Sequence, residues 1–225
     1  MSQPTAAALN TADSTYERLR GELLAGRLMP GQRLVEAELV ESLGVSRAIV
    51  RAVLTRLAHD GLVDKEPNRG ARVRMVSEEE AIEITQVRAT LEGLAARFAA
   101  ANATIEDIEC MRAILVEMRE MLARNDLLAY SDCNSRLHKL ILAASGHATA
   151  QRLIANLRAQ MVRFQYRTIL VPGRPNESLA EHTALVDAIV ARDGDKAETA
   201  MRNHLMHVTD NLARTKQVSG MVSSI

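Results

Sequence analysis

Three histidines and one asparagine occupy positions where a helix would otherwise bury apolar side chains. His138 follows Asn134 by four residues, and residues four apart share one face of a helix, so both side chains can reach one point. His182 and His204 stand in two further apolar stripes. Helical bundles build metal sites from facing helices, and imidazole suits transition metals. The pattern predicts a divalent metal site, with Zn as first choice and Ni, Mn or Fe as alternatives.

The predicted ligand set is electrically neutral when its histidines are neutral. No member of the set is anionic, so a bound cation would keep its full charge and open coordination positions, and we expect it to attract a carboxylate effector. A cation with open positions could also activate water, which leaves a metal-dependent hydrolase as an alternative. Against that alternative, we expect no carboxylate beside the histidine positions, because Glu181 precedes His182 but points off its face.

A second group of residues with chemical potential is basic. Ser46 is a good N-cap for a helix that starts at Arg47. The inward stripe of this helix consists of apolar residues, namely Val50, Val53, Leu54 and Leu57. Arg47 and Arg51 therefore face outward as like charges four residues apart, at a cost of about 0.2–0.5 kcal/mol. A polyanion would relieve that repulsion, and arginine reaches guanine edges in the major groove of DNA.

Local charge supports a DNA-reading surface, although the whole chain has a net charge of zero. Residues 44–76 hold seven basic and three acidic residues. Arg69 and Gly70 fall in the turn between two short β segments, where a glycine would permit close approach of the backbone to a groove. Aromatic residues make up only 2% of the chain, which disfavours readers of single-stranded nucleic acid because these need rings for stacking.

The elements that must position these side chains follow from periodicity and turn residues. In the first third we expect helices over 13–25, 36–43 and 46–60 and β segments over 62–65 and 71–76. That order predicts a winged helix-turn-helix. Beyond it we expect six helices, over 78–101, 104–124, 126–145, 147–168, 176–193 and 194–215. The predicted fold class is mostly α, an N-terminal winged helix-turn-helix followed by an all-α six-helix bundle.

Composition and charge divide the chain into four expected segments: a flexible arm (1–12), a DNA-binding domain (13–76), a helical effector and metal domain (77–215) and a flexible tail (216–225). No apolar run approaches the ~18 residues that a membrane span needs, and the N-terminus lacks the pattern of a secretory signal. The two cysteines form no disulfide framework, so we expect a reducing cytoplasm and no membrane partner.

The N-terminal segment is similar to a known family. The stretch PGQRLVEAELVESLGVSRAIVRAVLTRLAHDGLVDKEPNRGARV resembles the winged helix of GntR-type bacterial transcription regulators. The resemblance implies that Arg33, Ser46, Arg47 and Arg51 contact DNA, with Arg69-Gly70 at the tip of the wing. Members usually carry Thr-Pro after the Val-Ser-Arg element, whereas this chain has Ala48-Ile49, which removes one hydroxyl contact and bears on operator preference.

The helical segment also has a family likeness. The stretches VRATLEG, NSRLHKLILAASGH and SLAEHTALVDAIVARDGDKAETAMRNHL resemble the FCD ligand-sensing domain, in the FadR-type branch and its six-helix subgroup. This resemblance implies a metal held by Asn134, His138, His182 and His204, where many members have Asp at the first position. It implies a homodimer on a near-palindromic DNA operator, with repression released by a small organic acid.

The resemblance also points to residues for the effector. Arg88, in the family's R-x-x-x-E pattern with Glu92, would meet an effector carboxylate, and Arg163 is a second residue of this kind. The alternative for Arg88 is an i, i+4 surface pair with Glu92.

Two other functions stay open at this point: a purely structural metal, and a regulator for which the ion itself is the signal.

Overall fold

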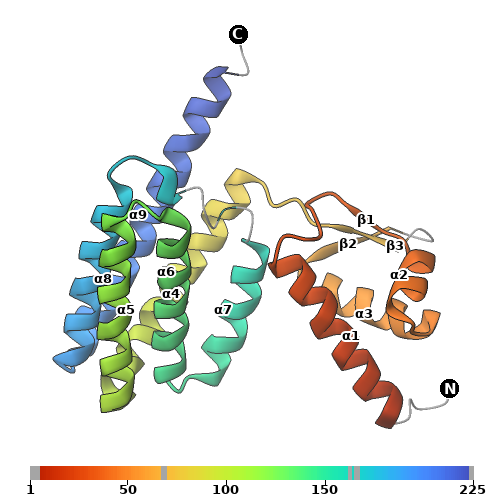
Figure 1. The fold of residues 1–225 in the computed structure, drawn as a ribbon, viewed down its shortest axis with the longest axis horizontal. Helices are drawn as coiled ribbons and strands as arrows, with labels where there is room; N and C mark the ends of the chain where they lie inside the picture. Colours follow the sequence, from red (N-terminus) through yellow and green to blue (C-terminus); the bar gives the residue numbers. More distant parts are fainter. Residues whose placement is uncertain (1–5, 67–69, 162–163, 165–167, 223–225) are drawn as a thin grey trace. The chain divides into compact units, whose positions relative to one another are not determined.

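The computed structural model describes residues 6–66, 70–161, 164 and 168–222. The chain forms two compact units (Figure 1): residues 1–76 with 158–163 make up the first, and residues 77–157 with 164–225 the second. Each unit has its own apolar core. None of the described helices is long and apolar enough to span a bilayer.

The first unit is a winged helix-turn-helix, as predicted. Its elements are α1 (Ala6–Leu24), β1 (Arg33–Leu34), α2 (Glu36–Leu43), α3 (Arg47–His59), β2 (Val63–Glu66) and β3 (Gly70–Val73). The three strands form an antiparallel sheet in the order β1-β3-β2. The sheet is the wing, and α2 with α3 forms the helix-turn-helix.

Local sequence explains the start and the packing of α3. Gly44, with φ of 66°, ends α2 in the left-handed region that favours glycine. Ser46 then caps α3, because its hydroxyl accepts a hydrogen bond from the Ile49 N–H at 3.3 Å. The predicted inward stripe is buried, with Val50, Val53, Leu54 and Leu57 at most 2% exposed.

Several boundaries differ from the sequence-based expectations. Helix α1 begins at Ala6, so residues 6–12, expected in an arm, are helical. Helix α9 continues to Val222, so most of the expected tail is helical as well. Helix α7 ends at Gln160, eight residues before the predicted end at 168. Strand β1 was not predicted, because a two-residue strand is too short to show an alternating pattern.

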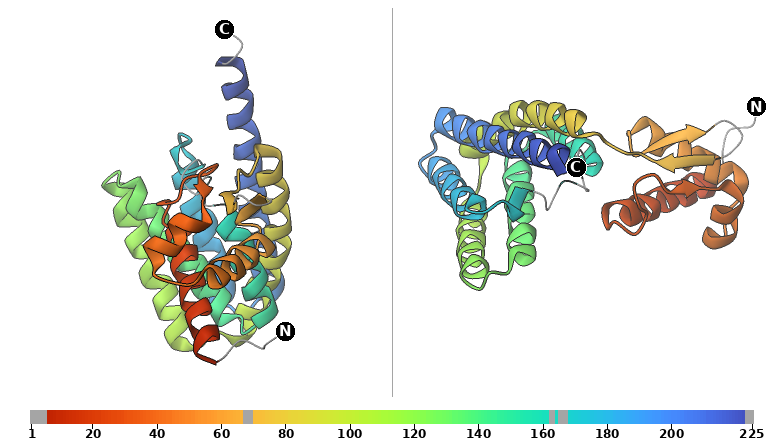
Figure 2. Two further views of the ribbon diagram at one scale, coloured as in Figure 1. Left: turned by 90° about the vertical axis from the view of Figure 1, so that its right-hand side faces the viewer. Right: turned by 90° about the horizontal axis from the view of Figure 1, so that it is seen from above.

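The second unit is the predicted all-α bundle. Its helices are α4 (Glu78–Asn102), α5 (Ile105–Ala123), α6 (Leu127–Ala144), α7 (Ala148–Gln160), α8 (Arg174–Val190) and α9 (Gly194–Val222), with a 3-10 turn at Thr168–Leu170. Within it α4 lies along α9 and α5 along α6, while α8 packs against α9 and α5 (Figures 1 and 2).

Small residues allow α4 and α9 to approach closely. The buried face of α4 is rich in alanine, including Ala89 and Ala96. At Gly93 of the same face, a Cβ atom would come within 2.7 Å of the Cγ atom of Arg202 on α9. This close packing places His204 of α9 in the same core as α4.

Candidate functional site

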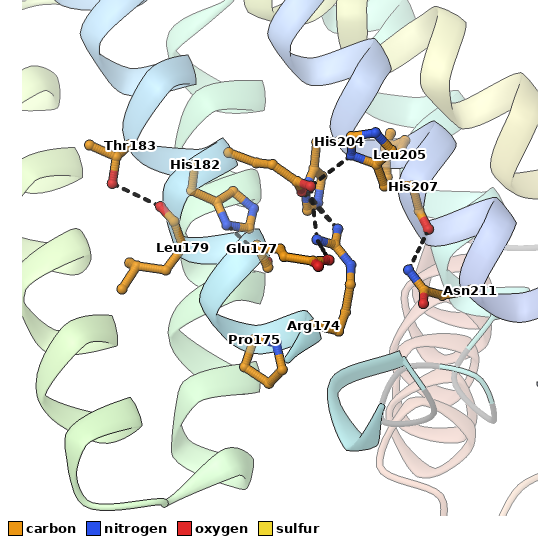
Figure 3. Close-up of polar contacts among 12 residues, drawn as sticks. Arg174, Pro175, Glu177, Leu179, His182, Thr183, His204, Leu205, His207 and Asn211 are labelled. Atoms are coloured by element: carbon orange, nitrogen blue, oxygen red, sulfur yellow. Dashed lines mark hydrogen bonds and ion pairs between the residues drawn. The ribbon is translucent and has the colours of Figure 1, made fainter. Parts of the chain in front are cut away.

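Three buried histidines from three helices meet in the core of the bundle. His138 lies on α6, His182 on α8 and His204 on α9, and each is at most 4% exposed. One ring nitrogen from each lies within 4.8 Å of the others. The Nε2 atoms of His138 and His182 are 3.1 Å apart. Figure 3 shows His182 and His204 facing each other between α8 and α9, so the structure brings the three predicted histidines together.

Asn134, the fourth predicted ligand, carries an unpartnered atom. It lies on α6 one turn before His138. Its Oδ1 atom is buried and has no hydrogen-bond partner among the residues that the structure describes. A buried acceptor left without a partner costs about 1–3 kcal/mol, and a cation would supply the missing interaction. The three imidazoles, with an amide oxygen one turn along α6 from His138, are a donor set that fits a divalent cation such as Zn²⁺.

Each histidine has a different partner on its Nδ1 atom. The Nδ1 atom of His138 lies 2.8 Å from Oε2 of Glu92. The Nδ1 atom of His204 lies 2.6 Å from Oε2 of Glu181. The Nδ1 atom of His182 lies 3.3 Å from the hydroxyl of Ser178, one turn earlier on α8.

The expectation that no carboxylate stands beside the histidine positions is therefore wrong. Glu181 does point away from His182, as predicted, but α9 brings His204 to it. Glu92 reaches His138 from α4, 46 residues away in sequence. Because two carboxylates contact the histidines, a cation here would not act with its full charge, which corrects the predicted electrostatics.

An arginine holds each of these carboxylates. Arg88 donates from Nε at 2.9 Å and from an Nη atom at 2.8 Å to Glu92. Arg174 donates to both oxygens of Glu181, at 2.9 and 2.7 Å. Arg88 does form the i, i+4 pair with Glu92, but the pair is not on the surface, because Glu92 is buried and the Arg88 side chain is only 13% exposed. Arg163, the second predicted effector residue, lies outside the described residues.

Burial keeps two of the histidines neutral. It lowers the pKa of His182 well below its usual value, and it lowers the pKa of His204 as well. Burial alone would raise the pKa of Glu181, but hydrogen bonds from His204 and Arg174 outweigh it and bring that pKa down to about 2. The core therefore offers neutral imidazoles, which are the form that binds metals, beside an ionised carboxylate.

A cavity of about 380 Å³ lies beside Glu181. Arg174 and Glu177 from α8 and His207 and Asn211 from α9 line it, and these four appear in Figure 3. His207 stands outside the inner stripe, as expected, and its Nδ1 atom lies 2.7 Å from Oε1 of Glu181. Sequence reasoning missed Arg174, because an arginine next to Pro175 at a helix start is typical of a solvent-exposed position.

The predicted DNA-contacting residues cluster in the first unit. Arg47 and Arg51 are exposed on α3, directly after the Ser46 cap. Arg51 nevertheless has an acidic neighbour that inspection of α3 alone did not reveal, since its Nε atom lies 3.6 Å from Oε1 of Glu36 on α2. Arg33 lies on β1, and its Nε atom is 3.5 Å from Oε2 of Glu66.

The backbone geometry of the wing requires a glycine at position 70. Its φ of 93° lies in the region that favours glycine. A Cβ atom at this position would come within 2.2 Å of the Leu34 carbonyl oxygen, so β1 can pair with β3 only if residue 70 is glycine. This steric reason is independent of DNA. Arg69, predicted at the tip of the wing, lies outside the described residues.

Comparison with known proteins identifies both units. The family model for "Bacterial regulatory proteins, gntR family" matches residues 11–73, and the model for the FCD domain matches residues 83–207. The chain is 28% identical over 202 residues to the HTH-type transcriptional repressor RspR of Escherichia coli strain K12, covering 90% of this chain and 89% of that protein. It is 29% identical over 238 residues to the galactonate operon transcriptional repressor of the same strain, covering 94% and 99%.

Two solved structures share the fold of this chain. E. coli McbR/YncC superposes with a TM-score of 0.73 at 22% identity, covering 92% of this chain and 98% of that chain. A putative GntR regulator from Rhodococcus sp. RHA1 superposes with a TM-score of 0.66 at 21% identity, covering 90% and 97%. RspR and the galactonate operon repressor are transcription regulators and not enzymes, which argues against the hydrolase alternative. The chain belongs to the GntR family of bacterial transcription regulators and carries that family's winged helix and FCD domain.

Proposed function

We propose that this DNA-binding regulator is a repressor whose affinity for its operator is controlled by a small carboxylate effector at a divalent metal centre. The observation that carries the proposal is the meeting of three buried histidines, together with the buried, unpartnered Oδ1 atom of Asn134 one turn before His138 on α6. A buried oxygen without a partner is costly unless a ligand satisfies it.

The metal would be held by Asn134, His138, His182 and His204. When bound, it would supply an electrophilic centre for an oxygen of the effector. Zn²⁺ is the first choice because the donors are mostly imidazole nitrogens, and Ni, Mn or Fe would suit a site with open positions.

The proposed DNA surface is built around α3. Ser46 fixes the start of this helix, and Arg47 and Arg51 extend from its exposed face. Arg33 on β1 and the Arg69-Gly70 tip would contact the flanking backbone. In a homodimer, two such helices would enter successive major grooves of a near-palindromic operator.

The effector class follows from charge and from the relatives. Arg88 is a partly buried cation paired with Glu92, the partner of His138, and one relative is named for an operon of galactonate, a sugar acid. A second relative, 30% identical over 188 residues, is a probable repressor of D-xylose utilization in Paenarthrobacter nicotinovorans. A small polyhydroxy carboxylate would combine both features. To bind Arg88, its carboxylate would have to compete with Glu92, which already holds the guanidinium.

The effector would act by favouring one arrangement of the DNA-reading heads. It can change operator affinity only to the extent that it binds the two arrangements differently. A sugar acid that binds the low-affinity arrangement 100-fold more tightly would weaken operator binding by at most the same factor at saturation, about 2.7 kcal/mol.

The proposal is tested by the operator affinity of the zinc-loaded protein with and without an organic acid. A high-affinity DNA duplex is first selected from a random pool with the purified protein, and its affinity is measured by fluorescence anisotropy with galactonate at fixed saturating Zn²⁺. Weakening of DNA binding in wild type, and its loss in His138→Ala, is the expected result. A response to Zn²⁺ alone, with none to organic acids, would instead identify a direct metal sensor. If DNA binding responds neither to Zn²⁺ nor to an organic acid, any metal in the bundle would have a structural role only.

A further inference from the structure

A lysine of the wing lies against the exposed face of α3. Strand β2 packs beside α3 (Figure 1), and Lys65 follows Val63 by two residues, so both side chains leave the same face of the strand. Val63 is 2% exposed in the apolar core, whereas Lys65 is exposed. The Nζ atom of Lys65 donates a hydrogen bond to Oγ1 of Thr55 on α3, at 3.1 Å. The strand thus brings an ammonium group to the surface of the helix.

Thr55 determines where this ammonium group lies. The hydroxyl of Thr55 donates to the Arg51 carbonyl oxygen at 2.7 Å, which uses its only hydrogen. The lone pairs of the same oxygen therefore accept from Lys65. An exposed lysine side chain otherwise has many rotamers, and the contact with Thr55 selects those that lie along α3.

The charge of Lys65 is not compensated by a carboxylate among the residues that the structure describes. The arginines of the wing differ in this respect, because Arg33 and Arg72 are both paired with Glu66. Asp64 precedes Lys65 directly, but neighbours along a strand point to opposite faces. A cation that is held by a neutral hydroxyl and lacks an acidic partner is suited to an anion from outside the chain.

The spacing along α3 fits the width of a DNA groove. Arg47, Arg51 and Thr55 are each four residues apart and are all exposed, so they form one row along the helix. From residue 47 to residue 55 the helix rises about 12 Å, and the major groove is also about 12 Å wide. The N-terminal end of a helix attracts a phosphate, whereas the C-terminal end repels one. Lys65 supplies a cation toward that second end.

We propose that Lys65 binds a phosphate at the edge of the major groove that α3 enters, and that Thr55 is the positioning residue for Lys65. This inference rests on the DNA surface proposed above. A phosphate contact carries no information about base sequence. Lys65 therefore adds the same affinity for operator and for random DNA, whereas Arg51 provides the discrimination between them.

The salt dependence of DNA binding by Lys65→Gln is the first test. Fluorescence anisotropy measures the affinity for the selected duplex and for a random duplex over a range of salt concentrations. One phosphate contact contributes about 0.9 to the slope of log affinity against log salt, which is about eightfold at 0.1 M salt. For each bound chain, Lys65→Gln should lower both affinities by about that factor and the slope by about 0.9.

Lys139→Gln, exposed on α6, is the matched control and should change neither the affinities nor the slope. An unchanged slope in Lys65→Gln would overturn the phosphate contact. A loss of affinity for the selected duplex alone would overturn it as well, because Lys65 would then read a base.

The positioning role is tested by a double-mutant cycle. Thr55→Val keeps the shape of the side chain but removes the acceptor, so it should weaken binding to both duplexes, though by less than Lys65→Gln. In the Lys65→Gln background it should have no further effect. Thr55→Ser retains the hydroxyl and should bind like wild type. An equal loss from Thr55→Val in both backgrounds would show that Thr55 contacts DNA independently of Lys65, and would overturn the positioning role.

Arg51→Ala in the same assay separates this inference from the proposed DNA surface. If Arg51→Ala removes the preference for the selected duplex while Lys65→Gln changes nothing, only the role of Lys65 is overturned. If both variants bind both duplexes like wild type, the proposed DNA surface is overturned together with it. Lys65 and Thr55 are exposed, so their substitution should leave the melting temperature unchanged. If Thr55→Val nevertheless unfolds, the salt dependence of Lys65→Gln still decides the phosphate contact.

Discussion

The Nδ1 atom of His204 lies 2.6 Å from a carboxylate oxygen of Glu181, although the two residues are 23 positions apart and lie on different helices. The same glutamate accepts hydrogen bonds from Arg174 and His207. One carboxylate thus links the histidine cluster to the cavity beside it, and α8 supplies His204 with a partner that its own helix, α9, does not provide.

Removal of a histidine should abolish stabilisation by zinc. A ligand that binds only the folded state at 100 times its Kd stabilises by about 2.7 kcal/mol. We expect Zn²⁺ to raise the melting temperature of the metal-free wild type by several degrees and to leave that of His182→Ala unchanged. Thermal melts with EDTA or Zn²⁺ measure this, and His59→Ala, exposed on α3, is the control. An equal shift in His182→Ala would place the zinc elsewhere.

Replacement of Asn134 should separate stability from metal binding. Its buried Oδ1 atom has no partner among the described residues, so Asn134→Leu should stabilise the metal-free protein, by about 1 kcal/mol, while weakening Zn²⁺ binding. Urea unfolding in EDTA and chelator competition give the two quantities. Loss of stability together with unchanged zinc affinity would show that the amide has a structural role only.

Arg51→Ala should abolish specific DNA binding without unfolding the protein. The side chain is 69% exposed, so its removal should change the free energy of unfolding by less than about 0.5 kcal/mol. Loss of a guanine contact should cost about 1–3 kcal/mol of discrimination between operator and random DNA. A gel shift with both duplexes measures this, and Arg112→Ala on the helical bundle is the control. Unchanged specific binding would refute the role.

Gly70→Ala should destabilise the winged helix. The new Cβ atom would lie 2.2 Å from the Leu34 carbonyl oxygen, in a backbone conformation that alanine rarely adopts, so a loss of at least about 1 kcal/mol is expected. Gly21→Ala is the matched control, because that glycine lies within helix α1 with open space around it, and the change should stabilise by about 0.5–1 kcal/mol. Urea unfolding compares them. Equal effects of the two substitutions would contradict this account of the wing.

Much of the fold could be predicted because it depends on short-range periodicity. The Ser46 cap, the apolar stripe of α3 and the six bundle helices were all predicted from neighbours within two turns. The predicted element boundaries were wrong where the sequence has no local pattern. Strand β1 is two residues long, and the ends of α1 and α9 lie in segments without a clear apolar stripe.

The sequence by itself determined which residues turn inward, because helical spacing alone puts His138, His182 and His204 on buried faces. Only the tertiary structure decided what surrounds them. Glu92 reaches His138 because α4 and α6 pack together, and Glu181 reaches His204 because α8 and α9 do. Contacts between helices depend on how closely and at what angle the helices cross, and residue spacing within one helix carries no information about either.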